Sequence, residues 1–297
     1  MRGSTGRREA SARARSRVER TRLAASAGPG TPDRESQMPA QAPDKRHLVA
    51  PWVLLAIIVA LWQAGVTVGG MPAFLLPSPS GVLSRLVVML SDAATWPYVG
   101  STMLEALGGC VLGAAVALPL AVLIHRSRWV NAAVSPFLGA TQAIPAIAIA
   151  PLLAIWAGYG LRPIILLCAL LVFFPILVAA VVGLRHVDHS IIDAARMDGA
   201  GHAALLTQIE LPLALPSILG GIRNGFTLSV TGAVVGEMVI GGEGLGQLLT
   251  IQRQVNDTAG MFATIVILCA LASVAYGAIY LVERRSAVIQ SLAGNRT

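Results

Sequence analysis

Charged side chains are scarce in this chain of 297 residues: they make up 12% of the sequence, whereas hydrophobic residues make up 55%. A soluble domain carries about 25% charged residues, so this composition argues against an ordinary globular enzyme. Lysine is nearly absent, and the only one is Lys45. A phosphate-binding loop needs a lysine after its glycines, so the chain does not hydrolyse ATP through that motif.

Side chains suited to metal binding or nucleophilic chemistry are also few. The three cysteines are an odd number, each lies in an apolar run, and no CxxC pair occurs, which argues against disulfides and metal binding. The histidines near expected loops lack metal-ligand spacing, and no catalytic triad or carboxylate pair is evident. We therefore expect no catalytic residue, no metal site, no cofactor and no enzyme activity in this chain. The residues concerned are Cys110, Cys168, Cys269, His125, His186, His189 and His202.

The basic charge is concentrated in the first 47 residues, which hold 11 of the 22 Lys and Arg and 5 of the 15 Asp and Glu. The net charge of +7 therefore describes a tail, and no nucleic-acid partner is expected. Its Arg, Ser, Ala and Pro content predicts disorder. Two alternatives stay open: a targeting signal around Arg7 and Arg8, and a translation start at Met38.

Apolar stretches long enough to cross a bilayer recur from Leu48 onward. We expect a basic cytoplasmic tail (1–47), a transmembrane domain (48–285) and a C-terminal cytoplasmic tail (286–297). Proline inside the spans, and small residues spaced four apart such as Gly109 and Gly113, favour a packed, kinked bundle that moves over a static scaffold. The six spans are expected near 48–68, 100–124, 132–157, 161–183, 216–240 and 260–282.

Arginine in the loops sets the expected orientation. Most of the loop arginines and the basic tail fall on one side, and only Arg85, Arg162 and Arg253 fall on the other. By the positive-inside rule both termini are cytoplasmic. Helical spacing of apolar residues over Gly81–Leu90 predicts a short helix on the outer surface.

The loop between the fourth and fifth spans, 184–215, is far longer than a connection requires. Ser190 followed by Asp193 has the spacing of a capping box, and Gly199 can end that helix in the left-handed conformation. A second short helix is expected at about His202–Ile209. The pair of helices would fit a groove on another protein, or would rest on the membrane surface as an amphipathic hairpin.

This loop resembles the EAA loop of bacterial ABC importer permeases, with Asp in place of Glu at its first position. Further motifs, such as Ala150-Pro151-Leu152-Leu153, are similar to the nitrate, sulfonate and taurine branch, including its importers of thiamine or riboflavin precursors. The resemblance covers roughly 50–285. The positions that match the loop motif, and by resemblance couple to an ATPase, are Asp193, Ala194, Ala195, Gly199, Ile209, Leu211 and Pro212.

The resemblance implies a six-helix bundle like that of type I ABC importer permeases, in a bacterial plasma membrane. It also implies a second permease copy, cytoplasmic ABC ATPase subunits, an extracytoplasmic solute-binding protein and contact with membrane lipid. The chain would carry a small organic solute, sulfonate-, nitrate- or taurine-like or a thiamine or riboflavin precursor. A self-sufficient secondary transporter is the alternative, and it would be expected to carry ionisable groups inside the membrane.

The fifth span carries the polar side chains of the bundle. Asn224, Thr227 and Thr231 fall on one narrow stripe at 100° per residue. They are candidates for the translocation path, although hydrogen bonding between helices is an equal alternative. Glu237 is assigned to the same path as a gate or docking residue, with a structural hydrogen bond as its alternative, because an ionisable group facing lipid would be costly.

Overall fold

The computed structural model describes residues 46–70, 72, 74–140 and 145–285, and within these ranges every regular element is a helix. The chain divides into two compact units, 1–58 and 59–297. The first described helix, α2 (Arg46–Val68), begins in the first unit. The expected tails therefore lie outside the described residues, except that Arg46 and His47 already belong to α2.

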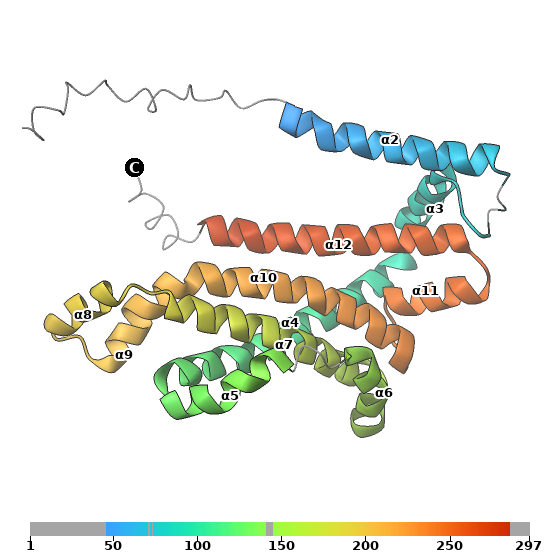
Figure 1. Ribbon diagram of the computed structural model, residues 1–297. Coiled ribbons are helices and arrows are strands. Elements are labelled where there is room, and N and C mark those ends of the chain that lie inside the picture. Colours follow the sequence, from blue (N-terminus) through green and yellow to red (C-terminus); the bar gives the residue numbers. More distant parts are fainter. Residues whose placement is uncertain (1–45, 71, 73, 141–144, 286–297) are drawn as a thin grey trace, which may run out of the picture. The chain divides into compact units, whose positions relative to one another are not determined.

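Four stretches are long and apolar enough to cross a membrane: Thr95–Arg126, Leu161–Arg185, His202–Gly241 and Thr258–Leu281. They coincide with four of the expected spans, and Val53–Val68 and Ile147–Ala157 form shorter apolar helices. Figure 1 shows the helices in order. Their bounds are α3 Pro79–Ser91, α4 Thr95–Arg126, α5 Arg128–Ala140, α6 Ala146–Ala157, α7 Leu161–Arg185, α8 His189–Met197, α9 His202–Ala204, η3 Leu205–Glu210, α10 Leu211–Gly236, η4 Glu237–Gly241, α11 Leu245–Gln254 and α12 Thr258–Arg285.

One expected span is wrong as a single helix. The stretch 132–157 is divided between α5 and α6, and Pro145 precedes the first residue of α6. A proline restricts the residue before it and lacks the N–H needed to continue a helix, which favours an interruption here.

The core of the second unit is built around α7, which packs against α4 on one side and α10 on the other. Glycines allow this close approach: a Cβ on Gly109 of α4 would lie 2.1 Å from the Cβ of Cys168 on α7. Ser229 of α10 also donates to the carbonyl of Ala106 on α4 at 2.7 Å. The small-residue spacing in the sequence thus predicted real helix contacts.

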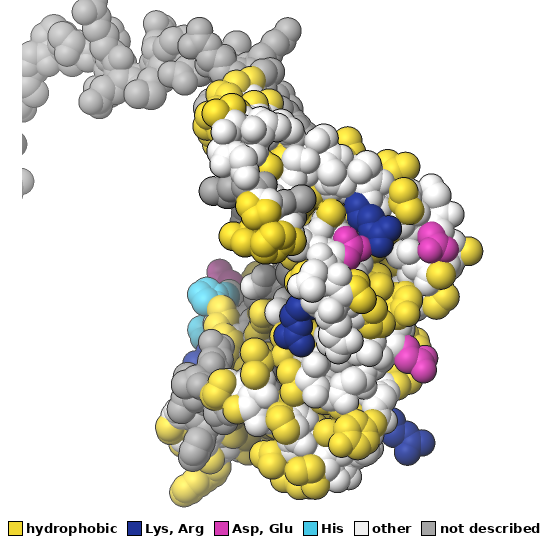
Figure 2. Space-filling view, turned by 90° about the vertical axis from the view of Figure 1, so that its right-hand side faces the viewer, with side chains coloured by type: hydrophobic (Ala, Val, Ile, Leu, Met, Phe, Trp, Pro, Cys, Tyr) yellow, Lys and Arg dark blue, Asp and Glu magenta, His cyan; other side chains and the backbone are white. Residues whose placement is uncertain are grey.

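The short helix expected at Gly81–Leu90 is α3, which begins slightly earlier. Ser78 is its N-cap and accepts from the backbone N–H of Gly81 at 3.2 Å, and Pro79 occupies the first turn. Arg85 of α3 pairs with Asp257, just before α12, at 2.7 Å. Figure 2, which looks onto the side where α3 and α11 lie, shows few charged side chains among hydrophobic and other ones.

Candidate functional site

The long loop begins with a cap that differs from the expected one. Asp188, and not Ser190, is the N-cap of α8: its carboxylate accepts from the backbone N–H of Ser190 at 2.9 Å. This backbone hydrogen bond lowers the pKa of Asp188 below the usual aspartate value. Asp193 lies in the second turn and instead pairs with Arg196 at 3.2 Å on the surface. The capping box was wrong because Asp188 offers an equally good cap two residues earlier.

Gly199 ends α8 as expected. Its φ is +86°, in the left-handed region that favours glycine. The N–H groups of Gly199 and Ala200 donate to the carbonyls of Arg196 and Ala195, both at 3.0 Å. This turn satisfies the last carbonyls of α8 and reverses the chain.

The expected second short helix is part of a much longer one. α9, the π-helical turn η3, α10 and the π-helical turn η4 form one continuous helix over His202–Gly241. Ile209 packs into a small apolar cluster with Leu205, Leu211 packs against the main core, and Pro212 lies in the second position of α10. Pro212 lies inside the continuous helix and has no N–H for its hydrogen-bond ladder, and the turn that precedes it widens into a π-helix.

The two alanines of the loop motif point in different directions. Ala195 is half-buried and packs with Val187, Ile192 and Leu205, whereas Ala194 is exposed. Ile191, Ala194 and Met197 recur at helical spacing, and the Met197 side chain is 87% exposed. α8 therefore presents a small apolar face that lies away from its supporting cluster.

A buried glutamate, which the sequence analysis did not single out, lies at the end of η3. Glu210 is 2% exposed, and its Oε2 is 3.3 Å from Nη2 of Arg126 and 3.5 Å from Nε2 of His125, both in the last turn of α4. Arg126 also donates to the carbonyl of His202 at 2.8 Å. We call Glu210, His125, Arg126 and this carbonyl the Glu210 cluster. An acidic residue within a long apolar helix, facing basic residues at the end of another, is the signal that could have revealed it.

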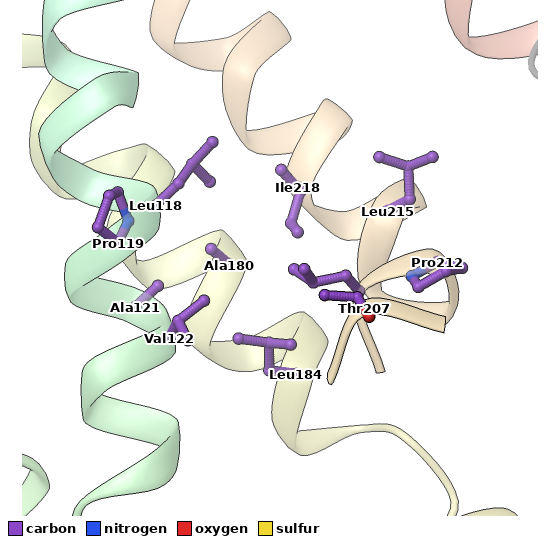
Figure 3. Close-up of a pocket in the computed structure, with 11 residues that line it drawn as sticks. Leu118, Pro119, Ala121, Val122, Ala180, Leu184, Thr207, Pro212, Leu215 and Ile218 are labelled. Atoms are coloured by element: carbon purple, nitrogen blue, oxygen red, sulfur yellow. The ribbon is translucent and has the colours of Figure 1, made fainter. Parts of the chain in front are cut away.

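An open apolar groove of about 550 Å³ lies beside the Glu210 cluster. Figure 3 shows its walls: Pro119 and Val122 come from α4, Leu184 from α7, and Thr207 and Ile218 from the helix that follows α8. At this level α4 and the start of α10 face each other across the groove. Motif residues Leu211 and Pro212 also line it.

The polar stripe of the fifth span is present on α10. Asn224, Thr227 and Thr231 are all exposed on one face, next to exposed Leu228. The two threonine hydroxyls donate to carbonyls four residues earlier in the same helix, at 3.3 Å each. They are therefore satisfied within α10 and still display their oxygens on its surface.

Glu237 does not share that face, because it is completely buried in η4. One carboxylate oxygen accepts from the hydroxyl of Thr102 on α4 at 2.7 Å, and the other accepts from the backbone N–H of Gly246. Thr102 in turn accepts from the N–H of Leu245 at 2.8 Å. Glu237 therefore lies on a buried face of the long helix, whereas the other candidate path residues lie on its exposed face.

Glu105, one turn along α4 from Thr102, completes this second buried site. It is 1% exposed, its carboxyl group lies close to that of Glu237, and its Oε2 is buried without a hydrogen-bond partner. We call Glu237, Glu105, Thr102 and the N–H of Gly246 the Glu237 cluster. Within the described ranges, no group of three His, Cys, Asp or Glu side chains is arranged to hold a metal ion.

Comparison with known proteins bears on this arrangement. Residues 109–288, which include α8, Glu210, Glu237 and all of α12, match the family described as "Binding-protein-dependent transport system inner membrane component". The riboflavin transport system permease protein RibX of Chloroflexus aurantiacus is 42% identical over 232 residues, 78% of this chain and 87% of that protein. The formylaminopyrimidine transport permease protein ThiX of Halalkalibacterium halodurans is 32% identical over 233 residues, 78% of this chain and 92% of that protein.

Solved structures agree on the fold. A chain of the MetNI methionine ABC transporter in an inward-facing conformation aligns with a TM-score of 0.58, covering 65% of this chain and 98% of that chain. The identity is 23%, so the likeness concerns the fold alone. The expected fold class, an all-α bundle like that of ABC importer permeases, is confirmed, and so is the resemblance seen in the loop motif.

Proposed function

This chain belongs to the family of binding-protein-dependent transport system inner membrane components, and from that membership we propose that it is the membrane-spanning permease subunit of an ATP-driven importer. It carries a small organic solute, delivered by an extracytoplasmic binding protein. Cytoplasmic ABC ATPase subunits supply the energy, because the chain has no lysine for a phosphate loop beyond Lys45. The chain itself is then a transport subunit and not an enzyme.

The apolar face of α8 is the observation that carries this proposal. Ile191, Ala194 and Met197 are exposed, while Ala195 and Ile192 hold the helix on its own apolar cluster. A small exposed apolar face on a supported helix suits insertion into a groove of a partner protein. The remaining motif positions support α8 without belonging to its exposed face. Gly199 forms the turn after α8, and Ile209, Leu211 and Pro212 lie where the following helix packs against the bundle.

The chain is a multi-pass membrane protein, and we propose that α8 lies on its cytoplasmic side. This orientation rests on the arginines, since Arg126, Arg185 and Arg196 all belong to the end of the bundle that carries α8. Both termini would then be cytoplasmic. A cysteine introduced at His202 should not react with an impermeant thiol reagent added outside intact cells, whereas one at Ser80 should.

The translocation path is proposed to run along the exposed face of α10, against a second copy of this chain. Asn224, Thr227 and Thr231 lie on this face, where their exposed polar atoms would otherwise meet lipid. For Glu237 we favour the alternative of a structural hydrogen bond, because its buried bonds suit a residue that fixes the helix end and not one that touches solute. The relatives named for riboflavin and formylaminopyrimidine favour a nitrogen heterocycle as the solute.

A second candidate function is supported by one observation. The carboxyl groups of Glu105 and Glu237 are buried together inside the bundle, as a self-sufficient, proton-coupled transporter would require. The two functions separate in proteoliposomes: uptake that needs ATP and the ATPase subunit supports the importer, whereas uptake driven by a proton gradient alone supports the secondary transporter.

The decisive test of the importer is the substitution Ala194→Trp, which enlarges the exposed face of α8 without entering its supporting cluster. We expect docking of the ATPase subunit to weaken at least about tenfold, the effect of losing roughly 1.4 kcal/mol at an interface. Ala93→Trp, also at an exposed alanine but beside α4's first turn, is the matched control and should leave docking unchanged. Equal co-purification of the ATPase subunit with both variants would contradict the proposal.

A further inference from the structure

The exposed helix α8 is connected to the bundle through one element. Among the described helices, α8 packs extensively only against η3, through Ile192 and Leu205. A displacement of α8 by a docked partner therefore reaches η3 first. From η3 the continuous helix leads directly into α10, but α4 shares no backbone continuity with this path.

The Glu210 cluster is the place where η3 meets α4. The Glu210 carboxylate lies between two basic side chains from the last turn of α4, and neither contact is a well-directed hydrogen bond. Attraction between opposite charges at low exposure therefore holds the two elements together. Arg126 adds a second tie by donating to the carbonyl of His202 at the start of the same helix.

The neighbouring groove leaves the contacts of the Glu210 cluster as the direct link between the two helices at this level. Leu118, Val122, Thr207 and Ile218 line an open space of about 550 Å³ between α4 and the helix that follows α8 (Figure 3). Side chains of the two helices do not fill this space, so at this level direct packing does not join α4 to the helix that follows α8, and α7 lies between them. The ion pairs of the Glu210 cluster bridge the helices where packing does not.

We propose that Glu210 is a positioning residue that makes α8, η3 and the adjoining end of α4 move as one body, so that a displacement of α8 reaches α4 and α10 together. This inference rests on the proposed importer function. The motif residues of the loop make contact with the ATPase, and Glu210, which lies between the motif positions Ile209 and Leu211, passes the movement on.

The first test measures transport per ATP in proteoliposomes that hold the full chain, its ATPase subunit and its binding protein. Glu210→Gln keeps the shape and removes the charge, so we expect normal co-purification and ATP hydrolysis but about tenfold less solute moved per ATP, within the usual range of coupling energies. Glu243→Gln, at an exposed glutamate outside the cluster, is the control. Unchanged transport per ATP in Glu210→Gln would overturn the inference, whereas failure of the unmodified chain to bind any ATPase would overturn the importer function instead.

The second test observes the movement itself. Spin labels at Asp198, after α8, and at Trp129, just beyond α4, are introduced in a Cys269→Ser background, because Cys110 and Cys168 are buried. We expect the distance between the labels to be the same with and without ATP in the unmodified chain. In Glu210→Gln we expect the distribution of distances to broaden or its mean to shift. A distance that changes with ATP in the unmodified chain would overturn the one-body arrangement.

A double variant with the two charges exchanged distinguishes loss of the ion pair from loss of folding. Glu210→Arg combined with Arg126→Glu restores the attraction between η3 and α4 but not the bond from Arg126 to His202. We expect this double variant to recover part of the transport per ATP that either single variant loses. Thermal unfolding shows whether the two single variants and the double variant are folded. If all three are folded and lose the same transport per ATP, a role for the charge pair is contradicted.

Discussion

The long helix His202–Gly241 ends in a π-helical turn on both sides, and each turn holds a buried glutamate that contacts α4. At the α8 end, Glu210 is balanced by two basic side chains beside an open groove. At the α11 end, Glu237 is satisfied by a hydroxyl and a backbone N–H, with glycines packed around it. The same residue type is therefore buried in two physically different ways.

The difference concerns how far each end can move. Charge attraction acts over a range of distances, so the Glu210 cluster can keep η3 and the end of α4 together while this end of the bundle moves as one body. The Glu237 cluster depends on short, directed hydrogen bonds and on close contact with Gly244 and Gly246, where small displacements are costly. The α8 end is built for movement, and the α11 end for a fixed geometry.

The largest effect is expected from Gly246→Ala at the fixed end. A Cβ there would lie 2.4 Å from the carbonyl oxygen of Val234 and 2.8 Å from Glu237 Oε2. Overpacking of this kind costs about 3 kcal/mol, so folded protein in detergent should fall sharply. Gly100→Ala, where the new Cβ meets nothing within 4 Å, should retain its wild-type yield.

A smaller effect is expected from Glu237→Gln, which gives one of its two donors no acceptor. The loss of a buried hydrogen-bond acceptor costs about 1–3 kcal/mol and should lower the thermal unfolding temperature. Glu105→Gln should be much milder, since Oε2 of Glu105 has no hydrogen-bond partner to lose. Equal losses for the two variants would show that the hydrogen bonds of Glu237 do not account for its effect on stability.

Gly199→Val tests the mobile end. The new side chain has open space, but a φ of +86° is strained for a β-branched residue by about 1–2 kcal/mol. We expect the bundle to fold and the ATPase subunit to be stimulated less, because the turn that orients α8 shifts. Normal stimulation of ATP hydrolysis by a folded Gly199→Val chain would show that the orientation of α8 is unimportant.

The smallest effect concerns the cap of α8. The lowered pKa of Asp188 means that its cap stabilises the folded loop above the ordinary aspartate pKa of about 3.9, and that this contribution is lost as the pH falls through the lowered folded value. Asp188→Ala should speed amide exchange at Ser190 at neutral pH, and the difference should vanish in strong acid. Asp188→Asn keeps an oxygen acceptor and should show no such pH dependence.

Hydrophobic length and glycine spacing determined much of the fold. Four expected spans and the small-residue contacts of α4 and α10 with α7 were predicted, because both depend on local composition. The left-handed Gly199 was predicted for the same reason. The capping box at Ser190 failed because Asp188 competed locally, and the span 132–157 failed because Pro145 divides it.

The sequence by itself thus determined the class of protein, the loop motif and the polar face of α10, all of which are carried by residues close together in the chain. Only the tertiary structure decided what Glu210 and Glu237 do, because their partners lie on α4, 85 and 135 residues away for His125 and Thr102. A sequence period places a side chain on a face of its helix, whereas the identity of the opposite helix depends on how the whole bundle packs.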